Sequence, residues 1–147
     1  MICTVLQNRD AAGILEVLDG CEMAEIRLDS CNLTPSEIED IFSSDVPLVA
    51  TCSIGGKVSA PMAERRLVKA IEAGARFVDV ELEAPKEMSK RVRSCARDNG
   101  TVFIRSFHDF KGTDSLPALK AIVDKCRYHG ADMVKIVTTA NSEEDAA

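Results

Sequence analysis

The stretch Glu25-Ile26-Arg27-Leu28-Asp29 decides between the folds open to this chain. Side chains alternate between the two faces of a strand, so the three charged residues share one face and the two apolar residues share the other. A later stretch, Val78-Asp79-Val80-Glu81-Leu82-Glu83, alternates in the same way. Both patterns fit a barrel whose apolar strand faces pack on outer helices and whose charged faces line the mouth. The alternative is a pair of edge strands, but edge strands of one sheet are not normally second and fourth in order.

Six short β-rich runs alternate with segments of helical pattern, which implies parallel strand pairing and right-handed crossovers. The expected strands are residues 2–6, 24–28, 47–52, 76–82, 101–107 and 133–138. The expected helices are residues 11–18, a helix opened by Thr34-Pro35-Ser36-Glu37, and residues 60–73, 85–99 and 115–128. An open dinucleotide-binding sheet usually places a glycine-rich phosphate turn after its first strand, and the chain has no such turn. We therefore predict an α/β protein of the (β/α)8 TIM-barrel type.

The number of predicted strands falls short of a full barrel. A (β/α)8 barrel has eight strands in about 200 to 250 residues, whereas these 147 residues supply six βα units. Residues 141–147 are typical of the cap and first turn of a sixth helix, which would have little stability if it ended there. The expectation is that residues 1–147 form a single barrel domain that is incomplete at its C-terminus.

Composition narrows the class of protein. The chain is 46% hydrophobic and 29% charged, which is typical of a water-soluble globular domain. No apolar run approaches the roughly 20 residues of a membrane span, and no secretory leader is visible, so a cytoplasmic location is expected. A net charge of −6 without a basic block argues against nucleic acid as a partner. The six cysteines form no CxxC pair and only two histidines are present, so we expect reduced thiols and no metal site.

Lys135 lies inside an apolar run, Ala131 to Thr139, where a lysine is uncommon. On a covered central strand its ammonium would lose water, and desolvation lowers the pKa of a lysine. A neutral amine attacks carbonyl carbons and forms Schiff bases. The alternative is a strand-end lysine whose stem lies on apolar surface while its amine reaches water.

His108 falls at the C-terminal end of the fifth predicted strand, in the segment Ser106-Phe107-His108-Asp109-Phe110. Barrel enzymes place their catalytic groups at this end of the strands. A histidine there can accept and return a proton near neutral pH. The alternative role is a hydrogen bond within the loop that follows the strand.

Three segments together resemble the type I 3-dehydroquinate dehydratases, the Schiff-base enzymes of the shikimate pathway. They are Glu25 to Asp29, Ser106 to Phe110 with Thr113 after it, and Gly130 to Ile136, and the match runs over essentially the whole chain. The histidine and lysine segments are the specific part, because other lysine-using barrels do not combine them in this way.

The resemblance implies a set of roles. Lys135 would condense with the ring ketone of 3-dehydroquinate, and His108 would remove a proton from the neighbouring carbon and protonate the departing hydroxyl. Glu25 and Arg27 would contact the substrate, with Asp29, Asp79 and Glu81 as weaker candidates that hold Arg27 in place. No metal or organic cofactor is implied. We expect a small-molecule substrate, no membrane partner, and a homodimer as the assembly to test. His129 is expected to cap a helix end at the surface.

One loop departs from the family pattern. After the third strand the family usually carries an arginine, then an acidic residue before paired glycines, whereas this chain reads Thr51-Cys52-Ser53-Ile54-Gly55-Gly56-Lys57. Ser53 stands roughly where the arginine is expected, so we include it among the substrate-binding candidates, and Ile54 does not replace the acid. Lys57 could supply a cation from the same loop, as a point charge without the fork of a guanidinium.

Two other functions remain open. A class I aldolase-type barrel would also use a lysine on the sixth strand, but it gives no particular role to Ser106 to Phe110. A non-catalytic or truncated remnant of the dehydratase family would keep the fold without the activity. The loop at Ser53 and the missing strands favour this second alternative, and intact His108 and Lys135 oppose it.

Overall fold

The computed structural model describes residues 2–146, and Met1 and Ala147 lie outside the described residues. Six parallel strands form one sheet in the order β1-β2-β3-β4-β5-β6. The strands are β1 Cys3–Leu6, β2 Met23–Arg27, β3 Leu48–Thr51, β4 Phe77–Glu81, β5 Val102–Asp109 and β6 Met133–Thr138. The helices are α1 Ala11–Leu18, α2 Pro35–Phe42, α3 Ala60–Ala73, α4 Lys86–Asn99 and α5 Leu116–Tyr128. Each strand pairs in parallel with the next one along the chain.

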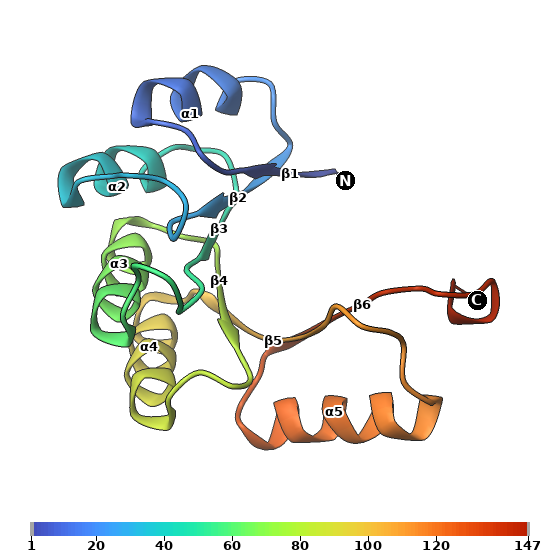
Figure 1. Ribbon diagram of the computed structural model, residues 1–147. Coiled ribbons are helices and arrows are strands. Elements are labelled where there is room, and N and C mark those ends of the chain that lie inside the picture. Colours follow the sequence, from blue (N-terminus) through green and yellow to red (C-terminus); the bar gives the residue numbers. More distant parts are fainter. Residues whose placement is uncertain (1, 147) are drawn as a thin grey trace.

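The sheet curves into a half-barrel, with the helices on its convex side (Figure 1). This confirms the predicted α/β barrel class. The core lies between the sheet and α1 to α4, and it is built from the outward residues of the strands, such as Ile26, Ala50, Val78 and Phe103. The opposite, concave face carries the charged residues of β2 and β4, as the alternation of these strands predicts.

The helix boundaries follow from local chemistry. The Asp10 side chain accepts a hydrogen bond from Gly13 N at 2.9 Å and starts α1. Thr34 and Glu37 form a reciprocal capping box that starts α2. Helix α3 ends at Gly74, whose φ of 118° suits a residue without a Cβ atom. Most predicted boundaries agree within one residue.

Two predicted segments differ from the observed ones. Strand β5 continues to Asp109 because its pairing with β6 extends to Asp109 and Thr138, so His108 lies within the strand. The segment at residues 141–147 was predicted to start an α-helix, but Glu144–Ala146 forms a 3-10 turn in the part that the structure describes. Its cap is present, since Asp145 N donates to the Ser142 hydroxyl at 3.3 Å.

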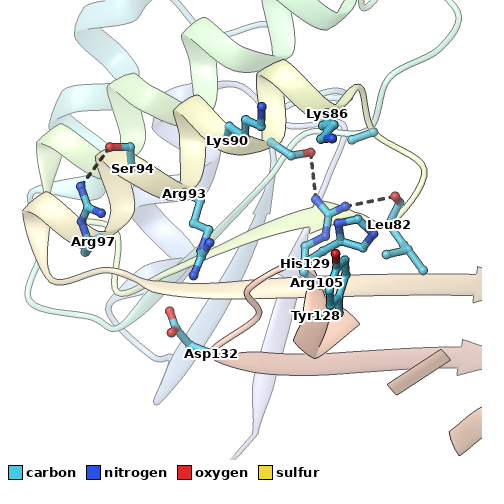
Figure 2. A pocket seen from close by; sticks show the side chains of 12 residues that line it. Leu82, Lys86, Lys90, Arg93, Ser94, Arg97, Arg105, Tyr128, His129 and Asp132 are labelled. Carbon is cyan, nitrogen blue, oxygen red and sulfur yellow. Dashed lines mark hydrogen bonds between the residues drawn. The ribbon is translucent and has the colours of Figure 1, made fainter. Parts of the chain in front are cut away.

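Helices α1 to α4 pack side by side, but the end of α5 stands away from α4 (Figure 1). A groove of about 520 Å³ therefore lies on the convex side of the sheet, between α4 and the end of α5 (Figure 2).

His129 caps α5 through its backbone and is exposed, as predicted. All six cysteines are unpaired thiols, also as predicted. Within residues 2–146, no helix has the length and apolar character needed to cross a membrane.

Candidate active site on the concave face

Lys135 projects from β6 into the concave side of the half-barrel, where it meets two carboxylates. Its Nζ donates to Asp79 Oδ2 at 3.1 Å and to Glu25 Oε2 at 3.4 Å. These residues come from β2, β4 and β6, and in barrels of this kind each interior layer is built from alternate strands. The sequence separations of 56 and 110 residues are thus bridged by the curvature of the sheet.

The charge state of Lys135 differs from the sequence-based prediction. Burial alone lowers the pKa of this lysine, as predicted, but the charges and hydrogen bonds of Asp79 and Glu25 outweigh burial. The pKa of Lys135 is therefore raised above its ordinary value, and the prediction that it is lowered is wrong. The resting side chain is an ammonium ion held by two carboxylates.

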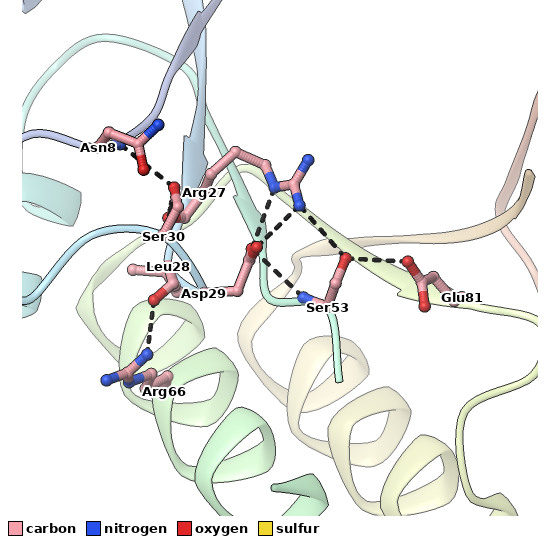
Figure 3. Close-up of polar contacts among 8 residues, drawn as sticks. All are labelled: Asn8, Arg27, Leu28, Asp29, Ser30, Ser53, Arg66 and Glu81. Atoms are coloured by element: carbon pink, nitrogen blue, oxygen red, sulfur yellow. Dashed lines mark hydrogen bonds and ion pairs between the residues drawn. The ribbon is translucent and has the colours of Figure 1, made fainter. Parts of the chain in front are cut away.

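A second polar group occupies the C-terminal ends of β2 to β4 (Figure 3). Arg27 Nε and Nη2 donate to the two oxygens of Asp29 at 3.0 and 2.8 Å, a bidentate pair. Arg27 Nη2 also reaches the Ser53 hydroxyl at 3.5 Å. Ser53 donates in turn to Glu81 Oε1 at 2.9 Å. Arg27 is thus held by Asp29, as predicted, whereas Asp79 pairs with Lys135 instead.

The electrostatics of this group favour its charged state. Burial raises the pKa of Asp29, but the hydrogen bond and charge of Arg27 outweigh burial, so the pKa lies below the usual value for an aspartate. The same hydrogen bond raises the pKa of Arg27. The guanidinium is fixed on one edge, and its third nitrogen, Nη1, makes none of the described hydrogen bonds.

Ser106 and His108 stand on the concave face of β5, beside the lysine strand. Ser106 is in register with Lys135, and His108 follows two residues later on the same face, in register with Val137. His108 is partly exposed and its ring stacks on Phe110, with a centroid distance of 5.8 Å. None of the described hydrogen bonds joins His108 to Lys135. The two predicted catalytic residues share one face of adjacent strands, as expected from their positions.

Several buried polar atoms on this face have no hydrogen-bond partner: Asp79 Oδ1, Ser106 Oγ and Thr51 Oγ1. A buried polar atom without a partner is costly, and such atoms in a native structure call for an explanation. A ligand rich in hydroxyl groups would supply the missing partners. Neither Ser106 nor Thr51 was predicted as a site residue, although their alternation with His108 and Ser53 places them on the same face.

The loop after β3 lies at the edge of this face. Lys57 lines a hollow of about 360 Å³ together with Asp29, Ser53 and Ile54. The cation predicted from this loop therefore faces the same hollow as the Asp29 carboxylate. Among the residues that the structure describes, no group of three or more His, Cys, Asp or Glu side chains could hold a metal ion.

The parallel half-barrel and its interior lysine, flanked by two carboxylates, define an α/β barrel protein with a charged interior. A family model described as type I 3-dehydroquinase matches residues 2–147, and the chain belongs to this family. The predicted family membership is therefore confirmed.

Sequence relatives bear the corresponding name. The chain is 35% identical over 132 residues to the 3-dehydroquinate dehydratase of Desulfotalea psychrophila, covering 86% of this chain and 58% of that protein. It is 33% identical over 151 residues to the 3-dehydroquinate dehydratase of Dehalococcoides mccartyi, covering 98% and 65%. The chain thus spans less than two thirds of the length of these two relatives.

A solved structure agrees with the fold. The type I 3-dehydroquinate dehydratase of Clostridium difficile superimposes with a TM-score of 0.85 at 21% sequence identity, over 97% of this chain and 64% of that one. At this level of identity the likeness establishes the shared barrel architecture, and residue roles depend on the geometry of the site itself.

Proposed function

We propose that this chain carries the central part of a type I 3-dehydroquinate dehydratase site, which eliminates water from 3-dehydroquinate to give 3-dehydroshikimate. The observation that carries the proposal is the placement of Lys135 Nζ at 3.1 Å from Asp79 and 3.4 Å from Glu25, inside the half-barrel. Family membership of the matched residues 2–147 supports the same reaction.

The chemistry requires each proton and bond to be accounted for. Lys135 first gives up a proton, for which Glu25 and Asp79 are the nearest acceptors. Its amine then adds to the ring ketone, and loss of water leaves a cationic iminium. His108 removes a proton from the neighbouring carbon, the carbon–oxygen bond breaks, and His108 returns the proton to the leaving hydroxyl. Hydrolysis of the iminium releases the unsaturated ketone and restores Lys135.

The raised pKa of Lys135 is compatible with this role. The iminium carries its positive charge at the same nitrogen as the resting ammonium, so the carboxylates that stabilise one also stabilise the other. The site thus stabilises the cationic intermediate. The same raised pKa lowers the fraction of Lys135 that is neutral before the reaction starts. A nearby proton acceptor, rather than a lowered pKa, then activates the lysine.

Substrate binding is assigned to the polar groups around this nitrogen. Arg27 offers its free nitrogen Nη1 to a carboxylate or hydroxyl oxygen, and Glu25 and Ser53 offer acceptors to hydroxyl groups. The unpartnered Asp79 Oδ1 and Ser106 Oγ extend this surface toward the reacting carbon. A polyhydroxylated carboxylic acid matches these groups.

The cellular location, the partners and the assembly of the enzyme are part of the proposal. We infer that it works in the cytoplasm on a small molecule, without nucleic-acid or membrane partners, as one barrel domain, and that a homodimer is the assembly to test. The net charge of −6 supports the absence of a nucleic-acid partner.

Covalent trapping tests the Schiff base directly. Borohydride added during turnover of 3-dehydroquinate should reduce the iminium and leave product-derived mass on Lys135, located by peptide mapping. Lys135→Arg should abolish both labelling and turnover, because a guanidinium offers no neutral amine near pH 7. Lys120→Arg, on the exposed side of α5, is the matched control and should keep both.

The outcomes separate the alternatives. Cleavage of sugar phosphates in place of dehydration, with label on Lys135, would establish an aldolase. A folded protein that takes no label from either substrate would establish a non-catalytic member of the family. The relatives of this chain from Desulfotalea psychrophila and Dehalococcoides mccartyi are named 3-dehydroquinate dehydratases. These names favour dehydration over aldol cleavage as the proposed reaction.

A further inference from the structure

A groove on the convex side of the sheet lies outside the candidate active site. It runs along α4 toward the start of β6, and its volume of about 520 Å³ is in the range of small-molecule pockets (Figure 2). Arg105 on β5 and the α4 residues that face the groove supply its positive charge. The alternation of β5 sends Arg105 to the face opposite Ser106 and His108, so this groove and the lysine site are separated by the sheet.

Arg105 is an unusual residue for this face of the sheet. It is only 3% exposed. Its Nη1 donates to Ser89 Oγ at 2.9 Å and its Nη2 to the Leu82 carbonyl oxygen at 3.0 Å, and both acceptors are uncharged. Its Nε is buried without a hydrogen-bond partner. The guanidinium therefore lacks the anionic partner that a buried cation normally has.

The electrostatic environment of Arg105 is that of a buried cation without an anionic partner. None of the described ion pairs includes Arg105. Burial lowers the pKa of Arg105, and the charges of Cys126, Glu83 and Asp79 offset burial only in part. Its partners are two uncharged hydrogen-bond acceptors and the Phe103 ring, whose centroid lies 5.9 Å from the guanidinium carbon, so its positive charge is not neutralised. An anion in the groove would provide the compensation.

Helix α4 adds further cations at helical spacing. Lys86, Lys90, Arg93 and Arg97 follow one another every three or four residues and line the groove. Neither Lys86 nor Arg93 belongs to any of the described ion pairs. Lys90 pairs with Glu87, and Arg97 with Asp98, on the exposed surface, where such pairs contribute little.

The side of the groove opposite α4 does not neutralise the positive charge of Arg105 and the α4 side chains. Asp132 is the carboxylate among the lining residues, and its Oδ2 already accepts a hydrogen bond from Phe103 N at 2.9 Å. The Arg93 guanidinium lies over Gly130, which has no side chain to obstruct it. Tyr128, at the rim, is 87% exposed and offers a flat apolar surface. The groove thus combines five cations, one engaged carboxylate and an aromatic rim on a chain of net charge −6.

We propose that this groove binds a small molecule that bears a phosphate group, with the phosphate between Lys90 and Arg93 over the buried Arg105. A phosphate monoester carries a charge of about −1.5 to −2 near pH 7 and three acceptor oxygens, which matches several cations better than a single carboxylate does. Arg105 contributes a fixed positive potential from the floor of the groove, and the α4 side chains contribute direct hydrogen bonds. The organic part of the ligand would lie against Tyr128.

Equilibrium dialysis at constant ionic strength tests the proposal with two ligands, inorganic phosphate and glycerol 3-phosphate. We expect saturable binding at one site. The double variant Lys90→Gln/Arg93→Gln should weaken binding about tenfold or more, since charge-assisted bonds to phosphate are lost. Arg105→Met should weaken it as well. Lys120→Gln, a cation of the neighbouring helix outside the groove, should leave the affinity unchanged.

The ligands distinguish the sources of the phosphate group. Tighter binding of glycerol 3-phosphate identifies an organic phosphate, and equal binding identifies free phosphate. Absence of saturable binding of both, or equal affinity in the double variant, overturns the proposal. Binding of an oligoglutamate peptide at this groove, with neither phosphate compound bound, also overturns it and indicates an acidic protein partner. The double variant alters only exposed side chains, so a folding defect of Arg105→Met would not obscure the result.

Discussion

The pKa of Lys135 is set by opposing effects of its surroundings. Burial disfavours its charge, and the two carboxylates favour it more strongly. Asp79→Asn removes one of these carboxylates, so we expect the pKa of Lys135 to fall. A ¹³C NMR titration of the protein after reductive methylation of its lysines measures this pKa, and exposed Lys120 serves as the internal reference. If the pKa stayed unchanged in both Asp79→Asn and Glu25→Gln, the carboxylates would not be its cause.

The same shift has a consequence for stability. Because the pKa of Lys135 is raised in the folded protein, protonation stabilises the fold at pH values below the pKa of the unfolded chain, about 10.4. This contribution is lost as pH rises through the raised pKa of the folded state. We therefore expect the Asp79→Asn protein to lose less stability than the unsubstituted protein in that alkaline window, as measured by urea unfolding at a series of pH values.

Individual residues of the site were predictable to different degrees. Lys135 and His108 could be selected from their positions in apolar and strand-end segments, and Arg27 from the charged face of its strand. The partner of Lys135 could not, because Asp79 is 56 residues away and meets it only through the curvature of the sheet. The direction of the lysine pKa shift was missed for the same reason, since it depends on the distance to those carboxylates.

At the scale of elements, α3 is the helix most fully held by its neighbours. It packs between α2 and α4, and Leu67 on its inner face is fully buried. Leu67→Ala should reduce the free energy of unfolding by about 2 to 5 kcal/mol, because it removes buried methyl groups and leaves a cavity. Leu15→Ala on α1, where the side chain is 43% exposed, is the control and should cost much less. Equal losses in urea unfolding would contradict this account of the core.

Element boundaries were predictable where local chemistry sets them. The cap at Thr34 and the glycines at 74 and 100 set helix ends that the sequence displays directly. Strand β5 ends two residues later than predicted, because pairing with β6 rather than local preference decides where it stops. The groove beside α4 was also not predicted: its cations are visible in the sequence, but the distance between α4 and α5 is not.

At the scale of the whole molecule, the alternation of charged and apolar residues on β2 and β4 predicted a curved sheet with a polar interior. The sheet that residues 2–146 form runs from β1 to β6, which are not paired with each other. Beside β6, the apolar side chains of Val123, Val134 and Ile136 line an open hollow of about 430 Å³. Within residues 2–146, β1 and β6 therefore each have one edge without a strand partner.

These open edges lead to a prediction about association. We expect the 147-residue chain to associate with a second copy through the β6 edge, because an unpaired strand edge and partly exposed apolar side chains favour pairing. The double variant Val134→Lys/Ile136→Lys places charges on this surface. It should raise the dissociation constant of the dimer about tenfold or more, since burial of each aliphatic side chain contributes about 1.5 to 3 kcal/mol.

Size-exclusion chromatography with light scattering over a concentration series measures this dissociation constant, and circular dichroism confirms that the variant is folded. Leu15→Lys, at an exposed apolar position on α1, is the control and should dimerise normally. A chain that stays monomeric at its highest soluble concentration, or a folded double variant with unchanged association, would contradict the prediction and assign the β6 edge no role in assembly.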